Sequence, residues 1–169
     1  MVRRSPVLRA IESHLGSRQV SRVVYGTIIG LALVVALEAH PPSSGVVVGT
    51  LLGTAVAVGL AELYSDFVGI EARTRRHVSR AELREMTRDV AGVAFGTAFP
   101  AVFFILAAAN AIDEDTAFTI AKWSGVGLLC CYGFAGARLA GDGLSASALR
   151  GLAAGLIGAF LIGLKALLH

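Results

Sequence analysis

Apolar residues gather into five long segments, and short stretches rich in Pro, Gly and charged residues separate them. Within each segment the apolar residues occupy every face of a helix rather than one stripe, which is typical of helices surrounded by lipid. Each segment is long enough to cross about 30 Å of hydrocarbon at about 1.5 Å per residue. We therefore expect an all-α integral membrane protein, a bundle of five transmembrane helices. The expected spans are residues 21–38, 45–70, 90–110, 116–137 and 148–168, preceded by a basic N-terminal segment over residues 1–20.

Local signals predict how some of these helices begin and bend. Ser79 and Glu82 have the spacing of a capping box, so the third helix should begin well before its apolar part. Pro100 lies near the middle of the third span, where its missing N–H predicts either a kink or a packed backbone whose polar groups find other partners. Ser145 or Ser147 is the expected N-cap of the fifth helix.

Arginines lie on one side of the expected bundle. They precede the first span, fill the connection between the second and third, and flank the connection between the fourth and fifth, whereas the other two connections contain no Lys or Arg. Because positively charged connections stay in the cytoplasm, we expect a cytoplasmic N-terminus and a C-terminus outside. Lys122 and Lys165 are then expected near the outer ends of their spans, where long side chains reach the headgroups.

Composition agrees with a membrane protein, since hydrophobic residues make up 55%, charged residues 16%, and the mean hydropathy is +0.71. The topological arginines account for the pI near 9.2, so nucleic acid is not an expected partner. Cys130 and Cys131 are adjacent, cannot plausibly bridge each other, and are expected to be buried thiols that only pack. The Ala-, Gly-, Val- and Arg-rich composition favours a bacterial inner membrane.

Glycines recur four residues apart in several spans, and such stripes let helix backbones approach closely in lipid. The longest stripe is Gly45, Gly49 and Gly53. Its main interpretation is packing within the bundle, and the alternative is the seam of a homodimer. The shorter stripes are Gly26 with Gly30, Gly92 with Gly96, and Gly151 with Gly155.

Two carboxylates stand out near the end of the second span, where the sequence reads GLAELYSDF. Glu62 and Asp66 are four positions apart, so they share one helix face. In a low-dielectric setting they repel each other if both are ionised, unless a cation or a shared proton lies between them. We therefore interpret them as candidate transport or proton-carrying groups and as candidate metal ligands. The alternative is that the span ends near Leu60 and leaves two ordinary interfacial charges beside Arg73 and Arg75.

Other polar groups give weaker signals. Glu38 and His40 follow the first span and are either part of an outer vestibule or solvated loop charges. Acidic and histidine side chains in the basic connection indicate either a metal site or simple helical partners of arginines, such as Glu71 with Arg75. These side chains are Glu71, His77, Glu82 and Glu85. No HExxH, GxSxG, P-loop or CxxC motif is present, so neither enzyme activity nor a bound cofactor is expected.

The C-terminal half contains the stretches GTAFPAVFFIL, YGFAGARLAGDG and SALRGLAAGLIGAFLIGLKALL. With five expected spans and a charged connection after the second, this pattern resembles the vacuolar iron transporter and nodulin-like family, from about Arg22 to the end of the chain. The resemblance implies a dimeric membrane protein that moves divalent metal, chiefly iron, out of the cytoplasm in exchange for protons. Of that family's metal-site residues only Glu62 is matched, because the first span reads GTIIG without a carboxylate and the second lacks methionine.

The leading functional hypothesis is a transporter of a small cation, a divalent metal such as iron or manganese with proton coupling, that uses Glu62 and Asp66. A homodimer in the lipid bilayer is the expected assembly. The alternative is a non-transporting membrane scaffold or accessory subunit whose basic connection binds anionic lipid or a partner protein.

Overall fold

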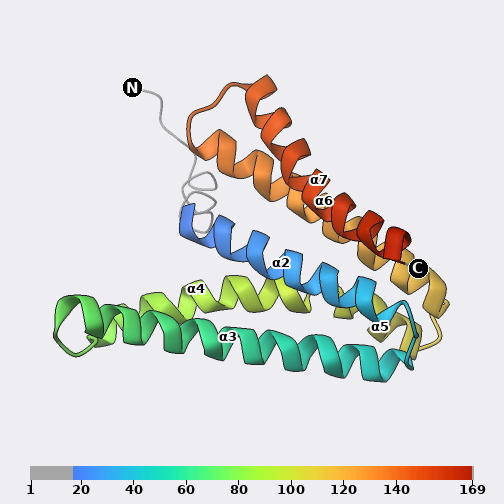
Figure 1. The fold of residues 1–169 in the computed structure, drawn as a ribbon, viewed down its shortest axis with the longest axis horizontal. Coiled ribbons are helices and arrows are strands. Elements are labelled where there is room, and N and C mark those ends of the chain that lie inside the picture. The colour runs from blue at the N-terminus through green and yellow to red at the C-terminus, as the bar shows by residue number, and fades with distance from the viewer. Residues whose placement is uncertain (1–16, 169) are drawn as a thin grey trace.

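The computed structural model describes residues 17–168, and within them the chain forms six helices and no strand (Figure 1). The helices are α2 (Ser17–Leu37), α3 (Ser44–Thr74), α4 (Arg80–Ala98), α5 (Ala101–Ala108), α6 (Glu114–Leu139) and α7 (Leu144–Leu168). The expected all-α class is therefore confirmed. Most of the expected basic segment over residues 1–20, and the side chain of Lys165, lie outside the described part of the chain.

Four of the described helices, α2, α3, α6 and α7, are long and apolar enough to cross a membrane. The pair α4 and α5 passes the same test together and is bent by 47°. The break falls at Phe99 and Pro100, which confirms the expected kink. Pro100 has no N–H to donate to the preceding turn, and its ring clashes with a straight continuation.

Helix starts follow the local signals in one case and depart from them in another. At α4 the capping box is confirmed: the hydroxyl of Ser79 accepts from the N–H of Glu82, and the carboxylate of Glu82 accepts from the N–H of Ser79. The expected N-cap at Ser145 or Ser147 is wrong, because α7 begins at Leu144 and places both serines in its first turn. The N–H of Ser147 donates to the carbonyl of Gly143 at 3.0 Å, so the preceding turn ends earlier than expected.

The helices form an antiparallel hairpin, α3 with α4, and a second antiparallel pair, α6 with α7, and α2 lies between them (Figure 1). α2 contacts α4 on one side and α6 and α7 on the other. We call the end where α2 begins and where α3 joins α4 the basic end. The opposite end, where α2 joins α3 and α5 joins α6, is the acidic end.

The backbones of α2 and α4 meet at the two glycine pairs Gly26 with Gly30 and Gly92 with Gly96. A Cβ on Gly26 would overlap the carbonyl oxygen of Val93, and a Cβ on Gly96 would lie 2.5 Å from the carbonyl oxygen of Val23. The hydroxyl of Thr97 lies 3.1 Å from the carbonyl oxygen of Gly26, within hydrogen-bond distance. These two stripes therefore serve packing within the chain, as helix association in lipid requires.

Glycines on α7 bring it equally close to α6. A Cβ on Gly151 would lie 2.8 Å from the carbonyl oxygen of Cys130, and a Cβ on Gly155 would overlap the Cys130 sulfur. Cys130 therefore packs on α7 as expected, but it is half-buried and not buried. Cys131 is exposed, so the expectation that it is buried is wrong. Its side chain is turned about 100° from that of Cys130 and leaves the contact with α7.

The stripe Gly45, Gly49 and Gly53 differs from the others. No described atom lies within 4 Å of a Cβ placed on any of the three, and all three are exposed. Packing within the chain, the main interpretation of this stripe, is therefore not found among the described residues. α3 instead packs on α4 and α5 through its opposite face, where Val47, Leu51 and Ala55 are buried.

We expect Gly26→Ala to lower the thermal unfolding midpoint of the detergent-solubilised protein by about 5 °C, because the added Cβ displaces the Val93 carbonyl at a cost of about 1–3 kcal/mol. Gly49→Ala is the matched control and should leave the midpoint unchanged or slightly raised, because its Cβ meets open space. Equal midpoints for the two variants would contradict the close α2–α4 contact.

Candidate functional site

Glu62 and Asp66 lie on the part of α3 that approaches the basic end. α3 has 31 residues and is about 46 Å long, more than the roughly 30 Å of a bilayer core. The helix runs unbroken from Ser44 to Thr74, past Leu60 and both carboxylates. Both carboxylates are half-buried and share one face, as their spacing predicts.

The two carboxylates converge on one guanidinium, that of Arg22 from α2. Nη2 of Arg22 lies 2.8 Å from Oδ2 of Asp66, and Nη1 forms an ion pair with Oε2 of Glu62. The cation expected between the carboxylates is thus supplied by the protein itself. Two carboxylates and one guanidinium leave one formal negative charge at this cluster, which we call the Arg22 cluster.

Gly92 on α4 leaves room for the side chain of Arg22. A Cβ on Gly92 would lie 3.3 Å from Cβ of Arg22, tighter than ordinary contact, so a larger residue there would press on the arginine stem. α2 approaches α4 closely, and α4 pairs with α3 in the hairpin. The guanidinium therefore reaches α3 although α2 and α3 contact each other little directly.

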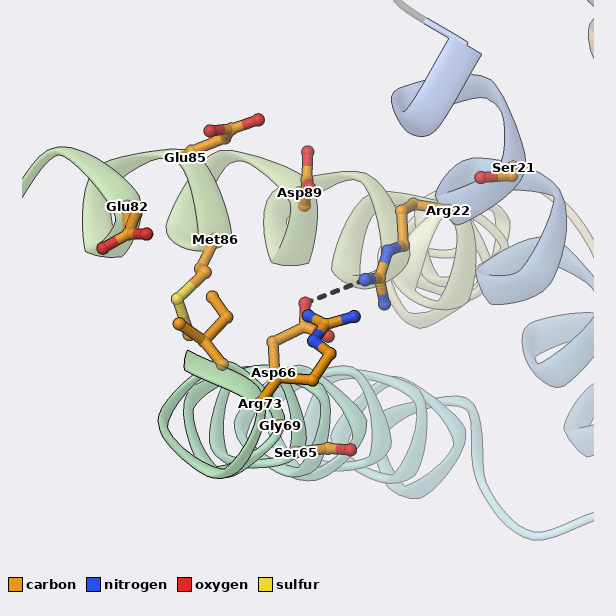
Figure 2. A pocket seen from close by; sticks show the side chains of 11 residues that line it. Ser21, Arg22, Ser65, Asp66, Gly69, Arg73, Glu82, Glu85, Met86 and Asp89 are labelled. Carbon is orange, nitrogen blue, oxygen red and sulfur yellow. Dashed lines mark hydrogen bonds and ion pairs between the residues drawn. The ribbon is translucent and has the colours of Figure 1, made fainter. Parts of the chain in front are cut away.

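Two members of the Arg22 cluster, Arg22 and Asp66, line a pocket of about 690 Å³ between α2, α3 and α4 at the basic end, and Glu62 is not among its lining residues. Figure 2 shows Arg22 and Asp66 in direct contact at its wall, with Met86 directed from α4 toward α3. Ser21, Ser65, Arg73 and Asp89 are also among its lining residues. A polar pocket of this size has room for several water molecules or a hydrated ion.

Two members of this site were missed from the sequence. Arg22 was interpreted as one of several topological arginines, although its place at the start of an apolar span was a usable signal. Asp89 is a lining residue and is 9% exposed. Its position three residues after the buried Met86 places it on the inward face of α4, which a helical projection from the capping box would have shown.

The structure does not assemble a metal-binding cluster from the predicted residues. Among residues 17–168, no group of three or more His, Cys, Asp or Glu side chains is arranged to hold a metal ion. The expected partnership of Glu71 with Arg75 is also absent as a side-chain pair in this part of the chain. Nδ1 of His77 lies 3.0 Å from Oε1 of Glu71 instead.

Glu82 has a different role, at the turn between α3 and α4. Arg76 donates two hydrogen bonds to it, at 2.6 and 2.8 Å, while Glu82 also caps α4. The hydrogen bond from Arg76, followed by those from the backbone and hydroxyl of Ser79, holds the pKa of Glu82 well below its usual range. The carboxylate therefore stays ionised at neutral pH and orders the turn.

Another ion pair, between Lys122 and Glu38, lies at the acidic end. Nζ of Lys122 on α6 donates to Oε1 of Glu38 at 2.5 Å, and both side chains are half-buried. Glu38 is therefore not a solvated loop charge. Nearby, Glu114 accepts hydrogen bonds from the N–H and the hydroxyl of Ser44, at 2.9 and 2.7 Å, at the start of α3.

Fold and site together define an all-helical chain with four or five potential membrane crossings and a charged cluster beside a polar pocket. Comparison with known proteins finds no matching family model, no matching curated protein and no matching solved structure.

We expect Arg22→Gln to destabilise the folded protein by about 1–3 kcal/mol, because it leaves two neighbouring carboxylates without their cation. The cost stays below that of a fully buried pair, since the three side chains are 21–32% exposed. Thermal unfolding in detergent measures the effect, and Arg75→Gln, at an exposed position, is the control.

Adding Glu62→Gln and Asp66→Asn to Arg22→Gln should recover part of the loss, because the repulsion disappears with the charges. The single variants Glu62→Gln and Asp66→Asn provide the comparison. If the triple variant is less stable than Arg22→Gln by the sum of the losses in these two single variants, the three residues do not act as one cluster.

Proposed function

We propose that this chain is a multi-pass protein of a bacterial inner membrane that transports a small cation. It has five spans, with α4 and α5 forming one bent span, a cytoplasmic N-terminus and the C-terminus outside. The single observation that carries the proposal is the Arg22 cluster at the polar pocket. The gathering of arginines at the basic end, opposite connections without Lys or Arg, supports the orientation.

The chemistry of the cluster supports exchange. With Arg22 in place, Glu62 and Asp66 carry one uncompensated negative charge, which a single proton can neutralise. If Arg22 withdraws, the pair carries two negative charges and suits a divalent cation. Arg22 and a transported ion therefore compete for the same two carboxylates, so that binding of one favours release of the other.

The identity of the ion comes from the resemblance to the vacuolar iron transporter and nodulin-like family, which favours Fe²⁺ or Mn²⁺ exchanged for protons. Carboxylate oxygens suit both ions, with Mn²⁺ being the better match to an all-oxygen site. Such an ion would be cargo and not a resident cofactor, and no catalytic role is part of the proposal.

A non-transporting scaffold or accessory subunit is the second candidate. The absence of a metal-binding group of three side chains among the described residues favours it. In that case the Arg22 cluster would be a permanent ion pair that joins α2 to α3.

Flux of Fe²⁺ and Mn²⁺ into proteoliposomes separates the two candidates. We expect uptake by the wild type, and a loss of about tenfold or more in Glu62→Gln and in Asp66→Asn, because each removes half of the charge that binds the ion. Asp115→Asn makes the same charge change at an exposed position in the first turn of α6, at the acidic end, and should transport normally. Correctly inserted wild-type protein without flux above empty liposomes would favour the scaffold.

We also propose a homodimer that forms through Gly45, Gly49 and Gly53. The stripe is exposed, whereas the other three glycine stripes lie in close helix contacts. In liposomes, wild-type copies that carry donor and acceptor fluorophores should show resonance energy transfer. For Gly49→Leu this signal should fall to background. Gly163→Leu is the matched control, since Gly163 on α7 is also exposed with no described atom near its Cβ, and it should retain the wild-type signal. A monomeric wild type, or equal loss in both variants, would contradict this seam.

A further inference from the structure

Three arginines form a stripe along α4 that the Arg22 cluster does not use. Arg80, Arg84 and Arg88 follow each other at intervals of four residues, so they lie on one face of the helix, and all three are exposed. Within the described part of the chain, none of them pairs with a carboxylate. Arg22, Arg76 and Arg150 do have such partners.

The arginine stripe continues an apolar surface of the same helix. Met86 and Asp89 are buried on the inward side of α4, and the arginines lie on its outward side. Along that outward side the next turns carry Ala91 and Phe95, both exposed. In a bilayer Phe95 would face acyl chains, and Arg88, about 10 Å earlier along the helix axis, would reach the headgroup level.

The positive charge of the arginine stripe favours an anionic ligand. Guanidinium groups four residues apart repel one another, and an anion placed along the stripe relieves that repulsion. Phosphate accepts two parallel hydrogen bonds from a guanidinium, which makes it a strong partner for arginine. Orienting the chain in the membrane needs only positive charge on this side, not unpaired arginines aligned with the lipid-facing surface of one helix.

We propose that Arg80, Arg84 and Arg88 form a docking surface for anionic phospholipid headgroups in the leaflet at the basic end. Continuity with the exposed Phe95 surface favours lipid over an acidic protein, because the stripe leads directly into the apolar outward surface of the same helix. The inference rests on the proposed membrane insertion and is independent of cation transport.

The test is a titration of delipidated full-length protein in neutral detergent with phosphatidylglycerol or phosphatidylcholine, followed by native mass spectrometry. The wild type should bind phosphatidylglycerol about 100-fold more tightly than phosphatidylcholine, at about fivefold for each of the three charges. Arg84→Gln with Arg88→Gln should weaken phosphatidylglycerol binding about 25-fold, at about fivefold per charge, and leave phosphatidylcholine unaffected. The variant with both residues changed to Lys should retain most of the preference.

Arg73→Gln with Arg75→Gln is the matched control, since it removes two exposed charges from the same hairpin but outside the stripe. It should change phosphatidylglycerol binding by less than about threefold. An equal loss of phosphatidylglycerol binding in both double variants would show that any positive charge on the hairpin attracts the lipid, and would contradict a specific site at the stripe. A wild type that does not prefer phosphatidylglycerol would overturn the proposal. Flotation with phosphatidylcholine liposomes checks insertion separately: failure to insert would also remove the proposed membrane function, whereas insertion without lipid preference removes this inference alone.

Discussion

The close approach of α2 and α4 is the contact on which the rest of the structure depends. In lipid, apolar surface alone gives little drive for helices to associate, so the backbones must come near enough for dense packing. Gly26, Gly30 and Gly96 allow this, and Thr97 adds a hydroxyl within hydrogen-bond distance of the facing backbone. Because α4 also packs against α3, the close packing of α2 on α4 places Arg22 next to the carboxylates of α3.

Ion pairs hold α2 at both of its ends, to different partners. Arg22 joins it to α3 at the basic end, and Glu38 joins it to Lys122 on α6 at the acidic end. Half-buried ion pairs contribute little net stability, because desolvation offsets much of the attraction. Their consequence is specificity of position, because any displacement of α2 along its axis must separate charges at both ends.

Features determined by neighbouring residues were predictable. The helix break at Pro100 and the capping box of Ser79 with Glu82 follow from backbone chemistry within one turn, and both are present. The start of α7 was misplaced because serine is a common N-cap, yet the preceding turn already ends at Gly143. The glycine stripes were recognisable by their spacing. The spacing did not show which stripes pack against another helix, because it is the same whether or not a helix lies opposite.

The sequence by itself determined the helical class, the apolar segments and the shared face of Glu62 and Asp66, because each depends on residues within a few turns of one another. It also indicated that the two carboxylates need a cation or a shared proton between them. Only the tertiary structure decided that this cation is Arg22, which lies 44 positions before Asp66 in the chain. That choice depends on how α2 crosses α4, and helix crossing is set by packing between distant segments, which no local pattern records.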